Sequence, residues 1–181
     1  MNPIFLVVGP PAVGKSTTSR ALAARFTKSV HIPVDDIRNM VVSGIVLPGA
    51  VWSDGLTKQV TLARTSVVQM ALTYHSAGFV VVIDDFWDPN HRSDYRALLS
   101  HPDIHKIVLY PGQGEAHRRN LQRSGEGPAR AYIDEGVRIV YQQLNAAVPR
   151  LAQEGWIVVD TTALSVEATV TMILQLTAAG T

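Results

Sequence analysis

The sequence predicts an α/β fold in which helices cover both faces of a parallel, five-stranded sheet. Five short apolar stretches rich in β-branched residues recur along the chain, at residues 4–8, 30–34, 79–83, 107–110 and 156–159. Each stretch is nearly continuous rather than alternating in polarity, which is typical of strands buried on both faces of a sheet. Segments with helical periodicity separate these stretches, and strands that alternate with helices form βαβ units.

The two longest predicted helices carry apolar residues at helical spacing. In the first, the residues expected on the buried face are Leu56, Val60, Val67, Met70 and Tyr74. In the second, they are Ile133, Val137, Val140, Leu144, Val148 and Leu151. Pro149 is expected to kink the second helix, because proline lacks the N–H group that the helical hydrogen bonds need. A last helix is expected to follow Ser165, whose hydroxyl can cap its N-terminus.

The composition describes an apolar globular chain without a broad charged field. At 181 residues and 46% hydrophobic content, one domain over residues 1–181 is the default expectation. The formal net charge is +1, so nucleic acid, whose binding a basic field assists, is not an expected partner. The absence of cysteine excludes disulfides, thiolate metal sites and cysteine nucleophiles. The segment MNPIFLVVGP lacks the pattern of a signal peptide, and no apolar run is long enough to span a bilayer, so a cytoplasmic protein with no membrane partner is expected.

Residues 9–16, GPPAVGKS, match the P-loop pattern GxxxxGK[ST] between a predicted strand and a predicted helix. Glycines allow the loop to turn tightly and bring its N–H groups against phosphate oxygens, and the helix dipole attracts the same anion. Lys15 would reach the β- and γ-phosphates, Ser16 would bind Mg²⁺, and Thr17 would lie near the α-phosphate. The residues expected to hold a nucleoside triphosphate are Gly9, Pro10, Ala12, Val13, Gly14, Lys15, Ser16 and Thr17.

Two aspartates close the second predicted strand, in the segment HIPVDDIRNM. A carboxylate there can face the γ-phosphate and accept the proton of an attacking hydroxyl group. Asp35 is favoured over Asp36 for this catalytic role. Arg38 would hold the acceptor or the transferring phosphoryl group, because its planar guanidinium matches phosphate oxygens. The alternative is that Asp35 or Asp36 caps the helix that contains Arg38, and the two roles are compatible if one aspartate caps while the other faces the cleft.

The third predicted strand ends in FVVVIDDFWDPNHR, where Asp84 is the expected Mg²⁺ carboxylate and Asp85 its competitor. Adjacent residues on a strand point in opposite directions, so only one of the two can face the metal. Trp87 could line an acceptor pocket, although a lone aromatic residue more often belongs to the core. His91 and Arg92 could be functional, with a solvated helix start as the alternative.

A small helical lid is expected over residues 112–132, with a mobile hinge at residues 124–129, SGEGPA. Cationic side chains on such a flap can close over the polyphosphate and offset charge on the transferred group. Four arginines flank the hinge: Arg118, Arg119, Arg123 and Arg130. Arg119 and Arg123 are the expected catalytic pair.

The loop after the fifth predicted strand, residues 160–164, is placed to pack on the nucleotide base, with Thr162 as the expected contact. The alternative is a plain strand-to-helix turn in which Ser165 caps the following helix.

Together these segments resemble the small P-loop kinases of the nucleoside-monophosphate-kinase-like group. The nearest resemblance is to the branch that contains chloramphenicol phosphotransferase, the zeta-toxin-like sugar-nucleotide kinases and the kinase domain of polynucleotide kinase. The segments that carry it are GPPAVGKST at 9–17, VDDIR at 34–38, VVIDDFWDPNHR at 81–92, RRNLQR at 118–123 and VVDTTALSVEATV at 158–170. The resemblance implies ATP and Mg²⁺, a lid, and phosphoryl transfer to a hydroxyl group. It also implies Asp35 as general base and Arg38 as a substrate- or phosphate-contacting residue.

The expected function is therefore an ATP-dependent kinase that phosphorylates a hydroxyl group of a small molecule. Residues 86–91, FWDPNH, lack the threonine–asparagine pair expected of the polynucleotide enzyme, so a nucleic-acid end is the less favoured acceptor. Residues 39–56 match no branch closely enough to name a substrate. The alternatives are a P-loop ATPase module and a regulatory switch, and the GTPase segments NKxD and DxxG do not occur in the sequence.

Overall fold

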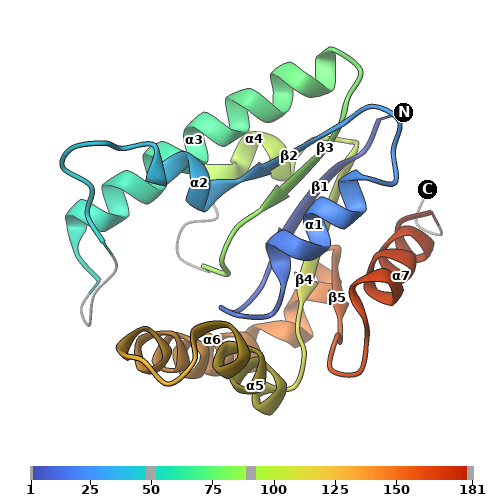
Figure 1. Ribbon diagram of the computed structural model, residues 1–181. Coiled ribbons are helices and arrows are strands. Elements are labelled where there is room, and N and C mark those ends of the chain that lie inside the picture. The colour runs from blue at the N-terminus through green and yellow to red at the C-terminus, as the bar shows by residue number, and fades with distance from the viewer. Residues whose placement is uncertain (1, 48–51, 89–92, 179–181) are drawn as a thin grey trace.

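The computed structural model describes residues 2–47, 52–88 and 93–178. Its strands form one parallel sheet in the order β2-β3-β1-β4-β5 (Figure 1). The strands are β1 (Ile4–Val8), β2 (Ser29–Pro33), β3 (Val80–Asp84), β4 (Ile104–Leu109) and β5 (Trp156–Val159). This arrangement confirms the predicted five-stranded parallel sheet.

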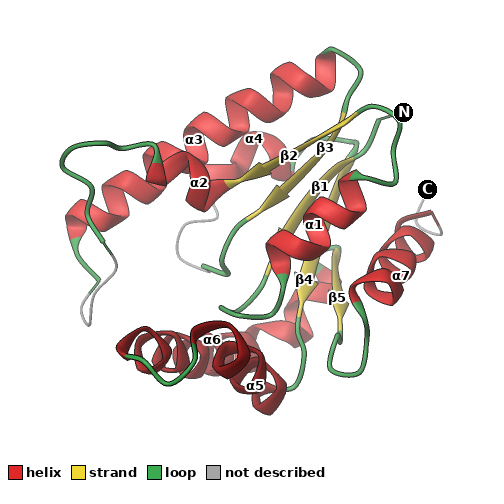
Figure 2. Ribbon diagram, viewed as in Figure 1, coloured by secondary structure: helices red, strands yellow, loops and turns green. Residues whose placement is uncertain are grey.

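Helices connect the strands and cover both faces of the sheet (Figure 2). They are α1 (Lys15–Ala23), α2 (Val34–Asn39), α3 (Asp54–Ser76), α4 (Arg96–Leu99), α5 (Gln113–Ser124), α6 (Pro128–Gln153) and α7 (Val166–Ala178). Side chains of α3, α4 and the C-terminal half of α6 pack on one face, and those of α1 and α7 pack on the other. The prediction of a three-layer α/β/α fold is therefore confirmed.

The sheet is buried on both faces because its strands are apolar at every position. All five residues of β1 are buried: Ile4 and Leu6 belong to the core beneath α3, and Phe5 and Val7 belong to the core beneath α1. Burial of such a side chain stabilises the fold by roughly 1.5–3 kcal/mol. Among the described helices, none has the length and hydropathy that a bilayer-spanning segment needs.

Two strand boundaries in the structure differ from the predicted ones. β2 ends at Pro33, one residue earlier than predicted, and Pro33 occupies the N-cap position of α2. Asp35 and Asp36 therefore lie in the first turn of α2 and not on the strand, and neither of them caps the helix. β4 begins at Ile104, three residues before its predicted start.

The buried face of α3 differs from the prediction at two positions. Tyr74 is 38% exposed and lies edge-on to Phe79, so it does not belong to the buried stripe. Arg64 is only 1% exposed. The helical spacing of apolar residues predicts which apolar side chains are buried. It cannot predict the burial of Arg64, which depends on carboxylates from other segments of the chain.

The predicted hinge at residues 124–129 is a short connection between two helices. α5 ends at Ser124, Gly125 follows with φ 60°, and α6 begins after Gly127 with Pro128 in its first turn. The buried side chain of Asn120 ties the two helices together. Its amide donates to the Arg130 carbonyl at 3.1 Å and to Asp134 Oδ1 at 2.8 Å. α5 and the start of α6 therefore form one hydrogen-bonded hairpin.

Candidate active site

The P-loop joins β1 to α1 and has backbone geometry that its sequence explains. A Cβ atom at Gly9 would lie 2.5 Å from the Leu109 carbonyl oxygen, so no side chain fits there. Ala12 and Gly14 both have left-handed backbone conformations, with φ 62° and φ 89°. Gly14 provides no side-chain cap for α1. The first N–H groups of this helix therefore have no side-chain acceptor at Gly14, as an anion-binding helix start requires.

Ser16 and Asp84, the two predicted metal ligands, meet in the structure. Ser16 Oγ donates to Asp84 Oδ1 at 2.8 Å. The other carboxylate oxygen of Asp84 lies 2.5 Å from His31 Nε2. A hydroxyl and a carboxylate are hard oxygen donors of the kind that Mg²⁺ prefers, so these residues fit that ion.

Lys15 lies among several charged side chains of the site. Its ammonium donates to the Pro10 carbonyl at 2.8 Å. Burial lowers the pKa of Lys15, while the charges of Asp84, Asp35 and Asp85 act to raise it. Arg123 also acts on Lys15 and lowers its pKa. Three carboxylates and a second cation are therefore close enough to the P-loop lysine to affect its protonation.

Asp35 and Arg38 lie beside this cluster on α2. Asp35 has a 65% exposed side chain, and its Oδ1 is 3.8 Å from Arg38 Nη2. The Arg38 side chain is only 11% exposed, and its Nε has no hydrogen-bond partner among the described residues. Burial raises the pKa of Tyr132 on α6, and the charges of Arg38 and Asp35 also act on this hydroxyl. Tyr132, near the start of α6, is therefore close to Arg38 and Asp35 on α2.

Asp85 lies on the opposite face of the sheet from Asp84 and belongs to a buried network. It accepts hydrogen bonds from Arg64 Nε at 2.7 Å and from the Tyr95 hydroxyl at 2.8 Å. Arg64 Nη1 also donates to Asp88 at 3.1 Å and to Asp94 at 3.4 Å. Burial would lower the pKa of Arg64, but the Asp85 charge raises it above the ordinary value, which keeps the guanidinium charged. The network is not visible in the sequence, because its members come from three separate segments.

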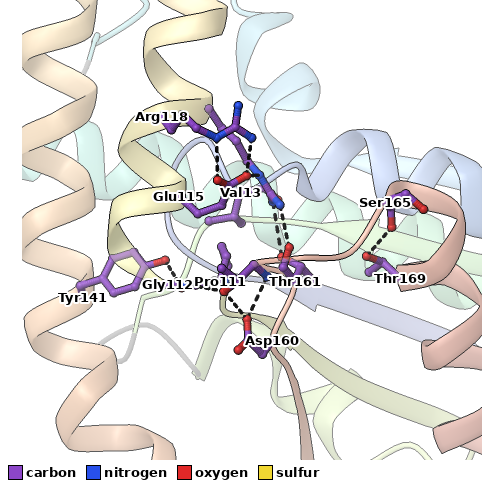
Figure 3. Close-up of polar contacts among 12 residues, drawn as sticks. Val13, Pro111, Gly112, Glu115, Arg118, Tyr141, Asp160, Thr161, Ser165 and Thr169 are labelled. Carbon is purple, nitrogen blue, oxygen red and sulfur yellow. Dashed lines mark hydrogen bonds and ion pairs between the residues drawn. The ribbon is translucent and has the colours of Figure 1, made fainter.

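The two favoured lid arginines occupy different places. Arg119 is held by Glu115 at 2.7 Å, by the Val13 carbonyl at 3.1 Å and by the Thr161 carbonyl at 2.7 Å. Arg123 is exposed and forms no hydrogen bond or ion pair with the described residues. Arg118 pairs with Glu115, three residues earlier on α5, at 2.6 and 2.7 Å (Figure 3).

A groove of about 480 Å³ lies where the P-loop, α5 and the loop between β5 and α7 meet. Thr162 lines it, and the Thr162 hydroxyl accepts a hydrogen bond from the Gly112 N–H at 2.7 Å. Ser165 caps α7 by accepting from the Ala168 N–H at 3.1 Å, as predicted. Figure 3 shows the segment from Asp160 to Ser165 running past α5 and the P-loop. The groove adjoins Gly14 and Thr17, so a base linked to P-loop phosphates could reach it.

The remaining candidates lie elsewhere or outside the described part of the chain. Trp87 is 3% exposed and lies edge-on to Trp156 in the core, and its backbone N–H donates to the Gly9 carbonyl at 3.1 Å. His91 and Arg92 lie outside the described residues. The sequence pattern did not predict the contact of His31 with Asp84 or the burial of Arg64 beside Asp85. The sequence gives one indication for His31: it lies two residues before Pro33 on a strand, so the two side chains are on the same face of the sheet.

A second group of possible metal ligands lies at the opposite end of the sheet. His75 Nε2 is 3.1 Å from Asp103 Oδ2, and the Asp103 N–H donates to His101 Nδ1 at 3.2 Å. Their ligand atoms lie within 4.8 Å of one another. Asp103 thus ties the end of α3 to the turn before β4, far from the P-loop.

The strand order and the P-loop between β1 and α1 define a three-layer α/β/α P-loop fold. Residues 4–138 match the AAA_33 family model, described as an AAA domain, and the chain belongs to this family. No curated protein matches the sequence.

Solved structures with the same fold share little sequence with this chain. Shikimate kinase from Acinetobacter baumannii, in complex with shikimate, is 16% identical with a TM-score of 0.69, over 99% of this chain and 95% of that one. The tunicamycin resistance protein of Deinococcus radiodurans is 16% identical with a TM-score of 0.66, over 97% and 95%. A gluconokinase from Sinorhizobium meliloti 1021 is 15% identical with a TM-score of 0.66, over 98% and 92%.

Proposed function

We propose that this protein is an ATP-dependent phosphotransferase that moves the γ-phosphate of ATP to a hydroxyl group of a small molecule. The observation that carries the proposal is the geometry at the carboxyl edge of the sheet. Ser16 Oγ donates to Asp84 Oδ1 at 2.8 Å, and Pro33, two residues before Asp35, is the register partner of Asp84. Asp84 belongs to the expected metal pair, whereas Asp35 belongs to α2 and is exposed to solvent. Phosphoryl transfer depends mainly on positioning and charge stabilisation, and these residues supply both.

In this proposal Asp35 is the general base. The acceptor hydroxyl gives its proton to the Asp35 carboxylate while its oxygen forms a bond to the γ-phosphorus. The bond between that phosphorus and the bridging oxygen breaks, and ADP leaves. Arg38 would contact the acceptor or the transferred group, since its buried Nε is a donor without a partner among the described residues.

Ser16 and Asp84 would hold Mg²⁺, which neutralises charge on the phosphates when it is bound. Lys15 adds a fixed positive charge beside them. Arg123, which is exposed in the last turn of α5 and has no hydrogen bond or ion pair with the described residues, would be the lid residue that approaches the phosphates. Arg119, which is committed to the P-loop and to Thr161, would instead hold α5 against the base groove.

Two alternatives keep the nucleotide site and change the acceptor. A P-loop ATPase or regulatory module would use water or no acceptor, and the exposed Asp35 beside Arg38 is the observation that disfavours it. A 5′-hydroxyl kinase of nucleic acid would need cationic surface for the polymer, and the net charge of +1 offers little. The resemblance to the chloramphenicol phosphotransferase branch supports a small-molecule acceptor, and a cytoplasmic location accords with the use of ATP.

The proposal is tested by measuring ATP turnover with and without a panel of small hydroxyl compounds, including shikimate, which one structural neighbour binds. A kinase should turn over ATP slowly alone and faster with its acceptor. Asp35→Asn should then lower transfer by about 100-fold or more, the usual contribution of a general base, and leave ATP affinity nearly intact. Lys15→Ala should weaken both. Near-normal transfer by Asp35→Asn would overturn the base assignment, and turnover indifferent to every acceptor would favour the regulatory alternative.

A further inference from the structure

Both oxygens of the Asp84 carboxylate have a protein partner. Oδ1 accepts from Ser16 Oγ at 2.8 Å, and Oδ2 lies 2.5 Å from His31 Nε2. The Asp84 side chain is 7% exposed and the His31 side chain 18% exposed. The contact is therefore shielded from solvent at the point where the P-loop helix begins.

The sheet order brings His31 to Asp84. β2 pairs in parallel with β3, and the register sets Pro33 opposite Asp84 and His31 opposite Val82. Residues two apart on a strand share a face, so His31, Pro33 and Asp84 all point toward the side covered by α1. Ser16 enters the same space from the first turn of α1. Side chains from β2 and α1 thus surround the carboxylate that β3 supplies.

The hydrogen bond from His31 restricts the orientation of the Asp84 carboxylate. An ionised carboxylate only accepts hydrogen bonds, so the N–H group at His31 Nε2 is the donor in the hydrogen bond to Asp84 Oδ2. With Oδ2 held by His31, rotation of the carboxylate is restricted and Oδ1 stays directed at Ser16. Partners that orient the ligands of a metal typically change its affinity or the activity by about 10–100-fold when they are removed.

We propose that His31 is a positioning residue that orients Asp84 toward Ser16 and thereby raises the affinity of the nucleotide site for a divalent cation. The inference rests on the proposed function, because it concerns the same site. His31 touches neither the acceptor nor the phosphates in this account, and it acts through Asp84 alone.

The test is a titration of the ADP-saturated protein with Mn²⁺, followed by electron paramagnetic resonance, which reports free and bound metal without turnover. His31→Ala should weaken Mn²⁺ binding by about 10-fold or more. His31→Gln keeps an N–H donor and should recover most of the affinity. ADP affinity without metal should be the same in all three proteins.

A matched control is Val30→Ala, since Val30 is the neighbour of His31 on β2 but packs against the opposite core. It should leave Mn²⁺ affinity unchanged. Equal Mn²⁺ affinity in His31→Ala and the unaltered protein would overturn the inference and leave the proposed function standing. Equal losses in His31→Ala and His31→Gln, or in Val30→Ala, would also overturn it. Failure of the unaltered protein to bind Mn²⁺ with ADP would instead contradict the proposed function.

Discussion

Asp84 and Asp85 are consecutive residues at the end of β3, yet their carboxylates serve opposite faces of the sheet. Asp84 meets Ser16 beside the P-loop, and Asp85 meets the buried Arg64 from α3. The alternation of side chains along a strand produces this separation. One aspartate is therefore available to the site, and its neighbour anchors the fold behind it.

This division predicts opposite phenotypes for two conservative substitutions. Asp85→Asn should destabilise the protein by about 1.5–3 kcal/mol, because it removes the carboxylate closest to the buried Arg64 and leaves, among the described residues, only Asp88 and Asp94 as its counter-charges. Asp84→Asn should change stability much less and abolish Mn²⁺ binding in the presence of ADP. Urea unfolding and Mn²⁺ titration of both variants measure the two effects. Comparable stability losses in the two variants would contradict the division.

Gly9→Ala should prevent nucleotide binding, because the added Cβ would meet the Leu109 carbonyl oxygen at 2.5 Å and force the P-loop to shift. Gly114→Ala is the matched control, since nothing lies within 4 Å of a Cβ at that position on α5. The control should bind ADP normally and gain helix stability of roughly 0.5–1 kcal/mol. Calorimetric titration with ADP checks both variants, and normal binding by Gly9→Ala would show that the loop does not need its observed path.

The loss of unfolding free energy at acidic pH should depend on Glu115. Hydrogen bonds from Arg118, aided by Arg119, lower the pKa of Glu115 from 4.5 to about 2. A depressed folded-state pKa means that the stabilisation is complete above the ordinary value and is lost as the pH falls from 4.5 toward 2. Glu115→Gln should therefore flatten the dependence of unfolding free energy on pH in this window. An unchanged slope in urea melts between pH 4.5 and 2 would refute the assignment.

Asn120→Ala should loosen the helical hairpin formed by α5 and the start of α6. The substitution removes the bonds to Asp134 and to the Arg130 carbonyl, and each such hydrogen bond contributes about 0.5–1.5 kcal/mol to stability. Hydrogen exchange should show faster exchange across α5 while the strands keep their protection. Gln122→Ala, an exposed change on the same helix, serves as the control. Unaltered exchange in Asn120→Ala would mean that other contacts hold the hairpin.

The parts of this structure that the sequence predicts are those set by local pattern. The P-loop is contiguous, with a strand before it and a helix after it. The alternation of side chains along a strand predicts that Asp84 and Asp85 point in opposite directions. Ser165 and its capping bond are equally local. These features depend on a few neighbouring residues.

The parts that escaped prediction depend on partners distant in the chain. Arg64 appears as a polar interruption of an apolar helix until Asp85 is known to lie against it. His31 gains a role only from the strand order, which sets β2 beside β3. The end of β2 was misplaced because Val34 continues the apolar run even though the helix has begun.

The most direct test of the central claim is a crystal structure with a non-hydrolysable ATP analogue and Mg²⁺. We expect the γ-phosphate to lie beside Lys15, the metal to lie on the side of Ser16 and Asp84, and the Asp35 carboxylate to face that phosphate across a space that admits an alcohol. A structure in which the carboxylates of Asp35 and Asp36 both point away from the γ-phosphate, with no room between, would contradict the assignment of this protein as a kinase.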